Sequence, residues 1–180
     1  LNPPLMTDNI IEKLRQQLFD ETDGNKFSKL KDKLLKKHST TDRIKVLDIF
    51  IDYTKNGKLP HWRNFLMTDI IDLVEENDNI DYFESTLTIP ELTYWGIDGL
   101  LKTNGKNGYA KLVDLILSDI QPVENKAKAI KSISLISKQP FDRSLPKDPG
   151  YWKKEDLRIE EIKKWQKGNY EDGKGYSVPA

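Results

Sequence analysis

Apolar side chains recur three and four positions apart along most of this chain, and that spacing constrains the fold more than any other feature. Such a period places apolar groups on one face of an α-helix. The first stripe runs from Ile10 to Phe19, after the candidate caps Thr7 and Asp8, and the second runs from Phe27 to Leu35. Capping residues, Pro and Gly separate successive stripes, so the sequence predicts a series of short helices.

Further helical segments are predicted in the same way. One begins at the capping group around Ser39 and ends at Asn56-Gly57. Its residues 44–53 are rich in β-branched side chains and could indicate a strand, but the length and the caps favour a helix. The remaining helical segments cover residues 60–74, 90–102, 109–117, 122–137 and 155–166, with a short segment around 82–87.

Short turns between helices of this length indicate antiparallel hairpins. The segments 90–102 and 108–118 read as one such hairpin. In the helix from Pro122, small and apolar residues at positions 127, 129, 130, 133 and 136 resemble the opening helix of a HEAT-type repeat. We therefore expect an all-α fold: a short HEAT-like stack of antiparallel hairpins in a single domain over residues 1–180. Residues 139–180 would form an irregular C-terminal capping segment. A compact irregular bundle is the alternative.

Several kinds of chemistry find no support in the sequence. The chain has no cysteine, which excludes disulfides, thiolate nucleophiles and Cys-ligated metals. Its two histidines, His38 and His61, have no partner at metal-ligand spacing, and no glycine-rich phosphate loop follows a strand. We therefore expect no enzymatic activity, no cofactor and no metal site. No apolar run reaches the roughly 18 residues of a membrane helix, and no signal peptide is visible, so we expect a cytoplasmic protein.

The formal net charge is zero, but the charges are strongly segregated. No Lys or Arg lies between Arg63 and Lys102, whereas nine acidic residues stand in that interval. Tyr and Trp residues are interleaved with them. This pattern predicts an acidic face that attracts a basic protein partner, with aromatic side chains as anchors. The predicted partner-binding residues are Asp69, Asp72, Glu75, Glu76, Asp78, Asp81, Tyr82, Glu84, Tyr94 and Asp98. The plain alternative is a solvated face with the aromatic rings in the core.

A basic block precedes the acidic interval. Six lysines between residues 24 and 37 are offset only by Asp32. The block could touch nucleic acid, but its one aromatic residue, Phe27, fits the apolar stripe. A solvated helix face is the favoured interpretation, and the block could also neutralise the acidic region across the molecule. Without a global basic field, we expect no direct nucleic-acid binding.

The C-terminal segment is the most distinctive part of the chain. It has a proline-rich stretch from Gln139 to Trp152, continues through Leu157, Ile162 and Trp165, and ends in a Gly- and Tyr-rich tail at 168–176. Over residues 90–176 the chain resembles bacterial HEAT-like immunity proteins, which are encoded beside toxins of contact-dependent growth inhibition and related polymorphic toxin systems. The prolines Pro140, Pro146 and Pro149, with Trp152 and Trp165, would close the end of the helical stack.

The resemblance implies a function as well as a fold. The protein would bind the C-terminal domain of a cognate toxin as a 1:1 heterodimer and occlude its active site or substrate groove. The toxin domain would be basic, as nucleases often are, and the acidic face would suit it. The alternatives are a HEAT-type scaffold or adaptor without a toxin partner, and a nucleic-acid-binding α-solenoid.

Overall fold

The structure, a computed structural model, describes residues 8–36 and 40–174. Within these ranges all regular elements are α-helices or 3₁₀ turns, and no strand is present. The all-α prediction is therefore confirmed. Contacts within the chain divide it into two compact units, Leu1–Val74 and Glu75–Ala180, which are described separately below as unit 1 and unit 2. The expectation of one domain over residues 1–180 stays a prediction.

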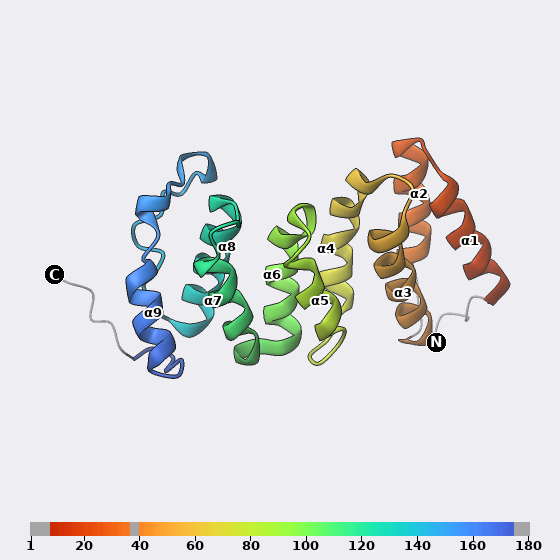
Figure 1. The fold of residues 1–180 in the computed structure, drawn as a ribbon. Coiled ribbons are helices and arrows are strands. Elements are labelled where there is room, and N and C mark those ends of the chain that lie inside the picture. The colour runs from red at the N-terminus through yellow and green to blue at the C-terminus, as the bar shows by residue number, and fades with distance from the viewer. Residues whose placement is uncertain (1–7, 37–39, 175–180) are drawn as a thin grey trace. The chain divides into compact units, whose positions relative to one another are not determined.

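Unit 1 contains four α-helices in its described residues. Helix α1 (Asp8–Asp20) packs against α2 (Gly24–Leu35) and α3 (Thr40–Asn56), and α3 packs against α4 (Arg63–Leu73). Figure 1 shows them in order from red to yellow. A 3₁₀ turn at Pro60–Trp62 leads into α4. The helix predicted over the β-branched run is confirmed by α3.

The core of unit 1 is built around Tyr53, which is fully buried. The ring centroid of Phe19 lies 5.0 Å from that of Tyr53, and that of Phe27 lies 5.3 Å away. Phe27 also packs on Trp62 at 4.5 Å. The chain passes so close to Tyr53 that a Cβ on Gly57 would lie 2.5 Å from the Tyr53 carbonyl oxygen. The predicted stop at Asn56-Gly57 thus has a steric reason, since only glycine fits there.

Helix caps in unit 1 can be compared with the predicted ones only in part. The predicted caps Thr7 and Ser39 lie outside the described residues, and so does His38. Asp8 is the first residue of α1. Asp23 caps α2, because its carboxylate accepts a hydrogen bond from the Lys26 backbone N–H at 2.9 Å.

Unit 2 carries the rest of the helices. In chain order they are α5 (Ile80–Thr86), α6 (Pro90–Asn104), α7 (Tyr109–Leu117), α8 (Val123–Ser137) and α9 (Ile159–Lys167). Helix α5 pairs with α6 and α7 pairs with α8, while α6 also packs on α8 and α7 on α9 (Figure 1). Helices α6 and α7 thus each contact the helix that lies two further along the chain. Such contacts are typical of stacked helical pairs, so unit 2 has the expected helical stack.

The hairpin expected between 90–102 and 108–118 is not the main pairing of α6. A 3₁₀ turn at Gly105–Gly108 separates α6 from α7, and α6 makes its largest contact with α5 instead. Two glycines explain this pairing. A Cβ on Gly99 would lie 2.0 Å from the Phe83 ring, and one on Gly96 would lie 1.9 Å from Thr86 Oγ1. The two backbones therefore approach more closely than any pair with side chains at these positions would allow.

The predicted capping segment packs on the end of the stack through aromatic residues. Trp165 on α9 is 4% exposed and Phe141 is fully buried. The Trp165 ring lies 5.3 Å from Tyr109 of α7, 5.4 Å from Phe141 and 4.7 Å from Tyr170. Trp152 is held differently, because its Nε1 donates to the Pro146 carbonyl at 2.8 Å. The structural role expected for both tryptophans fits these contacts.

Gln139 ties the tail to the end of α8. Its side chain is buried, and Nε2 donates to the carbonyls of Glu171 at 2.8 Å and Lys174 at 2.7 Å. The Gly173 N–H donates to the Ser137 carbonyl at 2.6 Å, which satisfies a group at the helix end. The tail is therefore bonded to α8 although it has no regular structure itself.

The last helix begins later than predicted. The sequence indicated a helix over 155–166, whereas α9 begins at Ile159 and a 3₁₀ turn occupies Lys154–Asp156. Leu157 explains the difference, because it is extended (φ −79°, ψ 125°) and only 7% exposed. Burying that leucine requires a break in the helix between the turn and α9.

An ion pair inside the capping segment should make the stability of unit 2 depend on pH. Arg143 donates to both carboxylate oxygens of Glu161, one of them at 2.8 Å from Nη1, and Arg158 lies 3.5 Å from the same group. The hydrogen bond from Arg143 is the main cause that lowers the pKa of Glu161, although burial opposes it. A lowered folded-state pKa stabilises the fold above the unfolded value of about 4.3. That stability is lost as pH falls through the folded-state pKa.

We expect Glu161→Gln to lower the free energy of unfolding by about 1–2 kcal/mol at neutral pH. The deficit should shrink as pH falls below about 4, because the wild-type carboxylate becomes protonated too. Urea unfolding at several pH values measures this. Glu160→Gln is the matched control, since its side chain is 80% exposed. A deficit that persists unchanged at low pH would contradict the assignment.

Candidate functional site

The predicted acidic residues belong to both units. Asp69 and Asp72 lie on α4 in unit 1, while the series from Glu75 to Asp98 lies in unit 2. A single face over residues 69–98 therefore stays a prediction, and each group is described where it lies.

In unit 1, one of the two acids is already paired. Lys31 Nζ on α2 lies 2.8 Å from Asp69 Oδ2, and each side chain is 19% exposed. Lys31 belongs to the basic block, so that block neutralises part of the acidic interval, as one interpretation of the sequence allowed. Asp72 is exposed.

In unit 2, lysines from later helices reach two more of the acids. Lys111 of α7 lies 3.9 Å from Glu84, and Lys128 of α8 lies 2.8 Å from Asp98. Asp98 also accepts a hydrogen bond from Ser132 Oγ at 3.4 Å. The negative charge of Glu84 and Asp98 is therefore partly neutralised by lysines that are far from them in the sequence.

The predicted aromatic anchors differ in exposure. Tyr82 is only 6% exposed, and its ring packs at 5.1 Å on that of Phe83. Tyr94 is 36% exposed, with Lys128 Nζ 5.0 Å above its ring. Only Tyr94 of this pair presents its ring at the surface of the folded protein.

A short acidic loop is defined here as residues 75–81, the last two of which belong to α5. It carries Glu75, Glu76 and Asp81, all exposed, and Asp78, which is partly exposed. No Lys or Arg occurs within it. This loop begins unit 2, ends in the first turn of α5 and is the most negatively charged part of the predicted set.

Hydrogen bonds hold the acidic loop in one conformation. The Asp78 carboxylate accepts from the Glu75 N–H at 2.9 Å, and Asn77 N–H donates to the Thr103 carbonyl at 2.8 Å. Thr103 itself donates from Oγ1 to the Gly99 carbonyl at 2.8 Å, inside α6. Asn77 and Asn79 adopt positive φ values of 70° and 51°, which asparagine tolerates better than most residues. The carboxylates are therefore presented on a backbone fixed to the end of α6.

The acids at the start of α5 also have a structural role. Asp81 lies in the first turn of that helix, where the helix dipole favours negative charge. This accounts for one of the four carboxylates, but Glu75 and Glu76 precede the helix and lie outside its first turn.

A second feature of unit 2 was missed by the sequence analysis. A groove of about 500 Å³ runs between α6 and α8, lined by aliphatic residues and by three lysines. Leu135 on α8 is 81% exposed and Ile136 is 41% exposed. Of the five positions that resemble the opening helix of a HEAT-type repeat, 127, 129, 130 and 133 are buried and 136 is exposed. The available signal was that Lys128, Lys131 and Leu135 share one helix face.

The basic helix α2 is a weaker candidate for a binding site. Lys26, Lys29 and Lys33 line a shallow cavity next to α1, but Asp20 and Glu21 line the same cavity. The cavity lining therefore carries both signs of charge, and no aromatic side chain lines it. This arrangement does not resemble the stacking surface of a single-stranded nucleic-acid site.

Three further observations concern the described residues alone. They contain no group of three or more His, Asp or Glu side chains placed to hold a metal ion. None of their helices has both the length and the apolar character needed to cross a membrane. His61 is exposed and its ring packs at 5.5 Å on Trp62.

Comparisons of the chain with protein-family models, with curated protein sequences and with solved structures find no significant match.

Proposed function

We propose that this chain is an immunity protein, which binds the C-terminal domain of a cognate toxin in the cytoplasm and blocks its active site or substrate groove. The observation that carries the proposal is the acidic loop of residues 75–81. Its exposed carboxylates have no cation among them in sequence, and its backbone is bonded to α6. The resemblance of residues 90–176 to HEAT-like immunity proteins adds independent support.

A rigid acidic loop suits inhibition of a basic nuclease for two physical reasons. Its field raises the rate of encounter with a positively charged surface. Its fixed backbone also means that little conformational entropy is lost on binding. Glu76 and Asp81 form the centre of the proposed contact, with Tyr94 as the accessible ring. Asp69, Glu84 and Asp98 already have lysine partners and contribute less charge.

The direct test is co-expression with the toxin domain encoded next to this gene. We expect a 1:1 complex by size-exclusion chromatography with light scattering, and restored growth of cells that produce the toxin domain. A complex without restored growth would favour a scaffold or adaptor. No complex and unchanged toxicity would refute the proposal.

Charge reversal within the acidic loop should slow complex formation. We expect Glu76→Lys with Asp81→Lys to reduce the association rate with the toxin domain about tenfold at low salt. The difference should shrink at high salt, because screening weakens long-range attraction. Stopped-flow or surface-plasmon measurements give both rates.

The control is the pair Asp119→Lys with Glu155→Lys, which changes net charge equally at two exposed acids outside the loop. It should affect the rate far less. Equal slowing by both pairs would show that overall charge, and not the loop, governs encounter.

A further inference from the structure

A pocket of about 290 Å³ lies in unit 1, between α2 and the segment that leads into α4. Helix α2 contributes residues at positions i, i+3, i+4 and i+7, which share one helix face. The lining residues are Gly24, Phe27, Ser28 and Lys31 of α2, with Trp62 of the 3₁₀ turn and Phe65 of α4. An apolar cavity of about 150 Å³ is enough to hold benzene, so this pocket can hold a ligand of one or two rings.

Three aromatic side chains form the walls of the pocket. Phe27 and Trp62 are 3% and 7% exposed, and their ring centroids lie 4.5 Å apart, so packing fixes both rings. Phe65 lines the same pocket but is 64% exposed. A flat aromatic ligand would cover the Phe65 ring, and aromatic rings attract one another beyond the area that they bury.

The indole N–H of Trp62 supplies a polar group. A buried tryptophan usually donates a hydrogen bond, as Trp152 and Trp165 do to backbone carbonyls. In the described part of the chain, the Trp62 N–H has no such acceptor. A Cβ on Gly24 would lie 3.9 Å from Trp62 Cζ2, which is bonded to the same ring carbon as Nε1. The edge of the indole that carries the N–H therefore faces the Gly24 side of the pocket.

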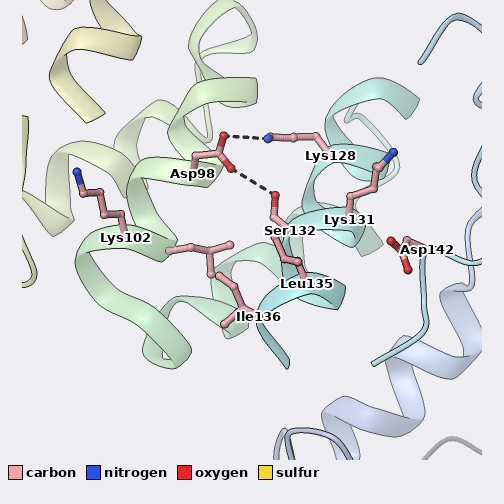
Figure 2. A pocket seen from close by; sticks show the side chains of 9 residues that line it. Asp98, Lys102, Lys128, Lys131, Ser132, Leu135, Ile136 and Asp142 are labelled. Carbon is pink, nitrogen blue, oxygen red and sulfur yellow. Dashed lines mark hydrogen bonds and ion pairs between the residues drawn. The ribbon is translucent and has the colours of Figure 1, made fainter. Parts of the chain in front are cut away.

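The pocket carries no net charge. Its one ionisable lining residue is Lys31, whose Nζ lies 2.8 Å from Asp69 Oδ2, and each of these side chains is 19% exposed. A charged ligand would lose hydration in the pocket without gaining an unpaired counter-ion, so an uncharged ligand is favoured. The groove between α6 and α8 in Figure 2 differs, because charged side chains of both signs line it.

We propose that this pocket binds a small molecule that contains an uncharged aromatic ring and a carbonyl oxygen. The ring lies among Phe27, Trp62 and Phe65, and the carbonyl accepts a hydrogen bond from Trp62 Nε1. The hydroxyl of Ser28, which lines the same pocket, can donate to the same ligand. The pocket shares no residue with the acidic loop, so the two surfaces act independently.

Benzamide is the probe, because it has one aromatic ring and one carbonyl and no charge. We expect it to bind the purified chain with a dissociation constant of about 1 mM, which is ordinary for a ligand with so few atoms. In NMR spectra it should move the indole N–H proton of Trp62 downfield, because that proton acquires an acceptor. It should also shift the ring resonances of Phe65.

Three related compounds each change one feature of the probe. Cyclohexanecarboxamide keeps the carbonyl but has no aromatic ring, and it should bind about fivefold more weakly. Toluene keeps the ring but has no acceptor, so it should not move the indole proton downfield. Benzoate has the shape of benzamide with a negative charge, and it should bind no more tightly because Asp69 already neutralises Lys31.

Two variants of this chain identify the pocket. Gly24→Leu should weaken benzamide binding about tenfold or more, because the new side chain extends towards Trp62 into the space that the ligand needs. Asn25→Leu is the matched control, since it adds the same side chain at the next, exposed residue of α2, which does not line the pocket. It should leave binding unchanged. Both variants should keep the far-ultraviolet circular dichroism of the parent, because both positions are exposed.

The inference is overturned if millimolar benzamide leaves the Trp62 indole proton in place, or if cyclohexanecarboxamide binds as tightly as benzamide. Tighter binding of benzoate would show that Lys31 is open to an anion, which contradicts an uncharged ligand. Equal effects of Gly24→Leu and Asn25→Leu would place the binding elsewhere. The toxin is absent from this experiment, so its outcome does not depend on the immunity function.

Discussion

Replacing Trp165 by alanine is expected to lower the free energy of unfolding of unit 2 by about 4 kcal/mol. The indole is 4% exposed and contacts the rings of Tyr109, Phe141 and Tyr170. Its removal leaves a cavity at the end of the stack, where nothing else on α9 except Ile162 is buried. We expect α9 and the tail to detach from α7 under conditions in which the rest of the molecule stays folded.

Urea unfolding monitored by circular dichroism measures the loss, and hydrogen exchange at α9 locates it. Tyr151→Ala is the control, because this large residue lies in the same capping segment but is 67% exposed. It should change the free energy by no more than about 0.5 kcal/mol. If Trp165→Ala were as mild as this control, the cap would not contribute to the stability of unit 2.

Gly99→Ala should also destabilise unit 2, by about 2–3 kcal/mol. Alanine is the better helix former by about 1 kcal/mol, so propensity alone predicts the opposite sign. The steric effect prevails because the new Cβ would lie 2.0 Å from the buried Phe83 ring. Either α5 moves away from α6 or the ring leaves its place, and both lose packing.

A double-mutant cycle tests that cause. Phe83→Leu removes the ring that meets the new Cβ, so the double variant should be more stable than the sum of the two single effects predicts. Gly24→Ala serves as the control, because its Cβ would meet only the Trp62 ring at 3.9 Å. Strict additivity of Gly99→Ala and Phe83→Leu would contradict the steric explanation.

The helices themselves could be read from the sequence because their signals are local. The spacing of apolar residues, together with Gly, Pro or Asn at the ends, predicted the bounds of α3, α6 and α8 to within about two residues. The start of α9 could not be read in this way, since the helix propensity around Glu155 is overridden by burial of Leu157. The sequence also did not indicate the pairing of α6 with α5. That pairing depends on the close approach of Gly96 and Gly99 to Thr86 and Phe83, which only the folded structure shows.

The candidate site shows the same division between local and tertiary information. Clustering of acids between Arg63 and Lys102 is visible in the sequence. The lysines that neutralise Asp69, Glu84 and Asp98 come from α2, α7 and α8. No local sequence pattern indicates these pairs, because their members lie far apart in the chain. Leu135 was overlooked for a related reason. An aliphatic residue in a helix is usually buried, and only the packing of α8 on α6 leaves this one exposed.

The bonds from Gln139 to the carbonyls of Glu171 and Lys174 bear on the order of folding during synthesis. Domains generally fold as they leave the ribosome, beginning with the N-terminal part. The hydrogen bonds of Gln139 at the end of α8 cannot form until more than 30 further residues have been synthesised, because their acceptors lie 32 and 35 positions downstream. In that interval Phe141 and Tyr109 lack the Trp165 ring that covers them. A nascent chain paused in this window should therefore be the most susceptible to proteolysis and aggregation.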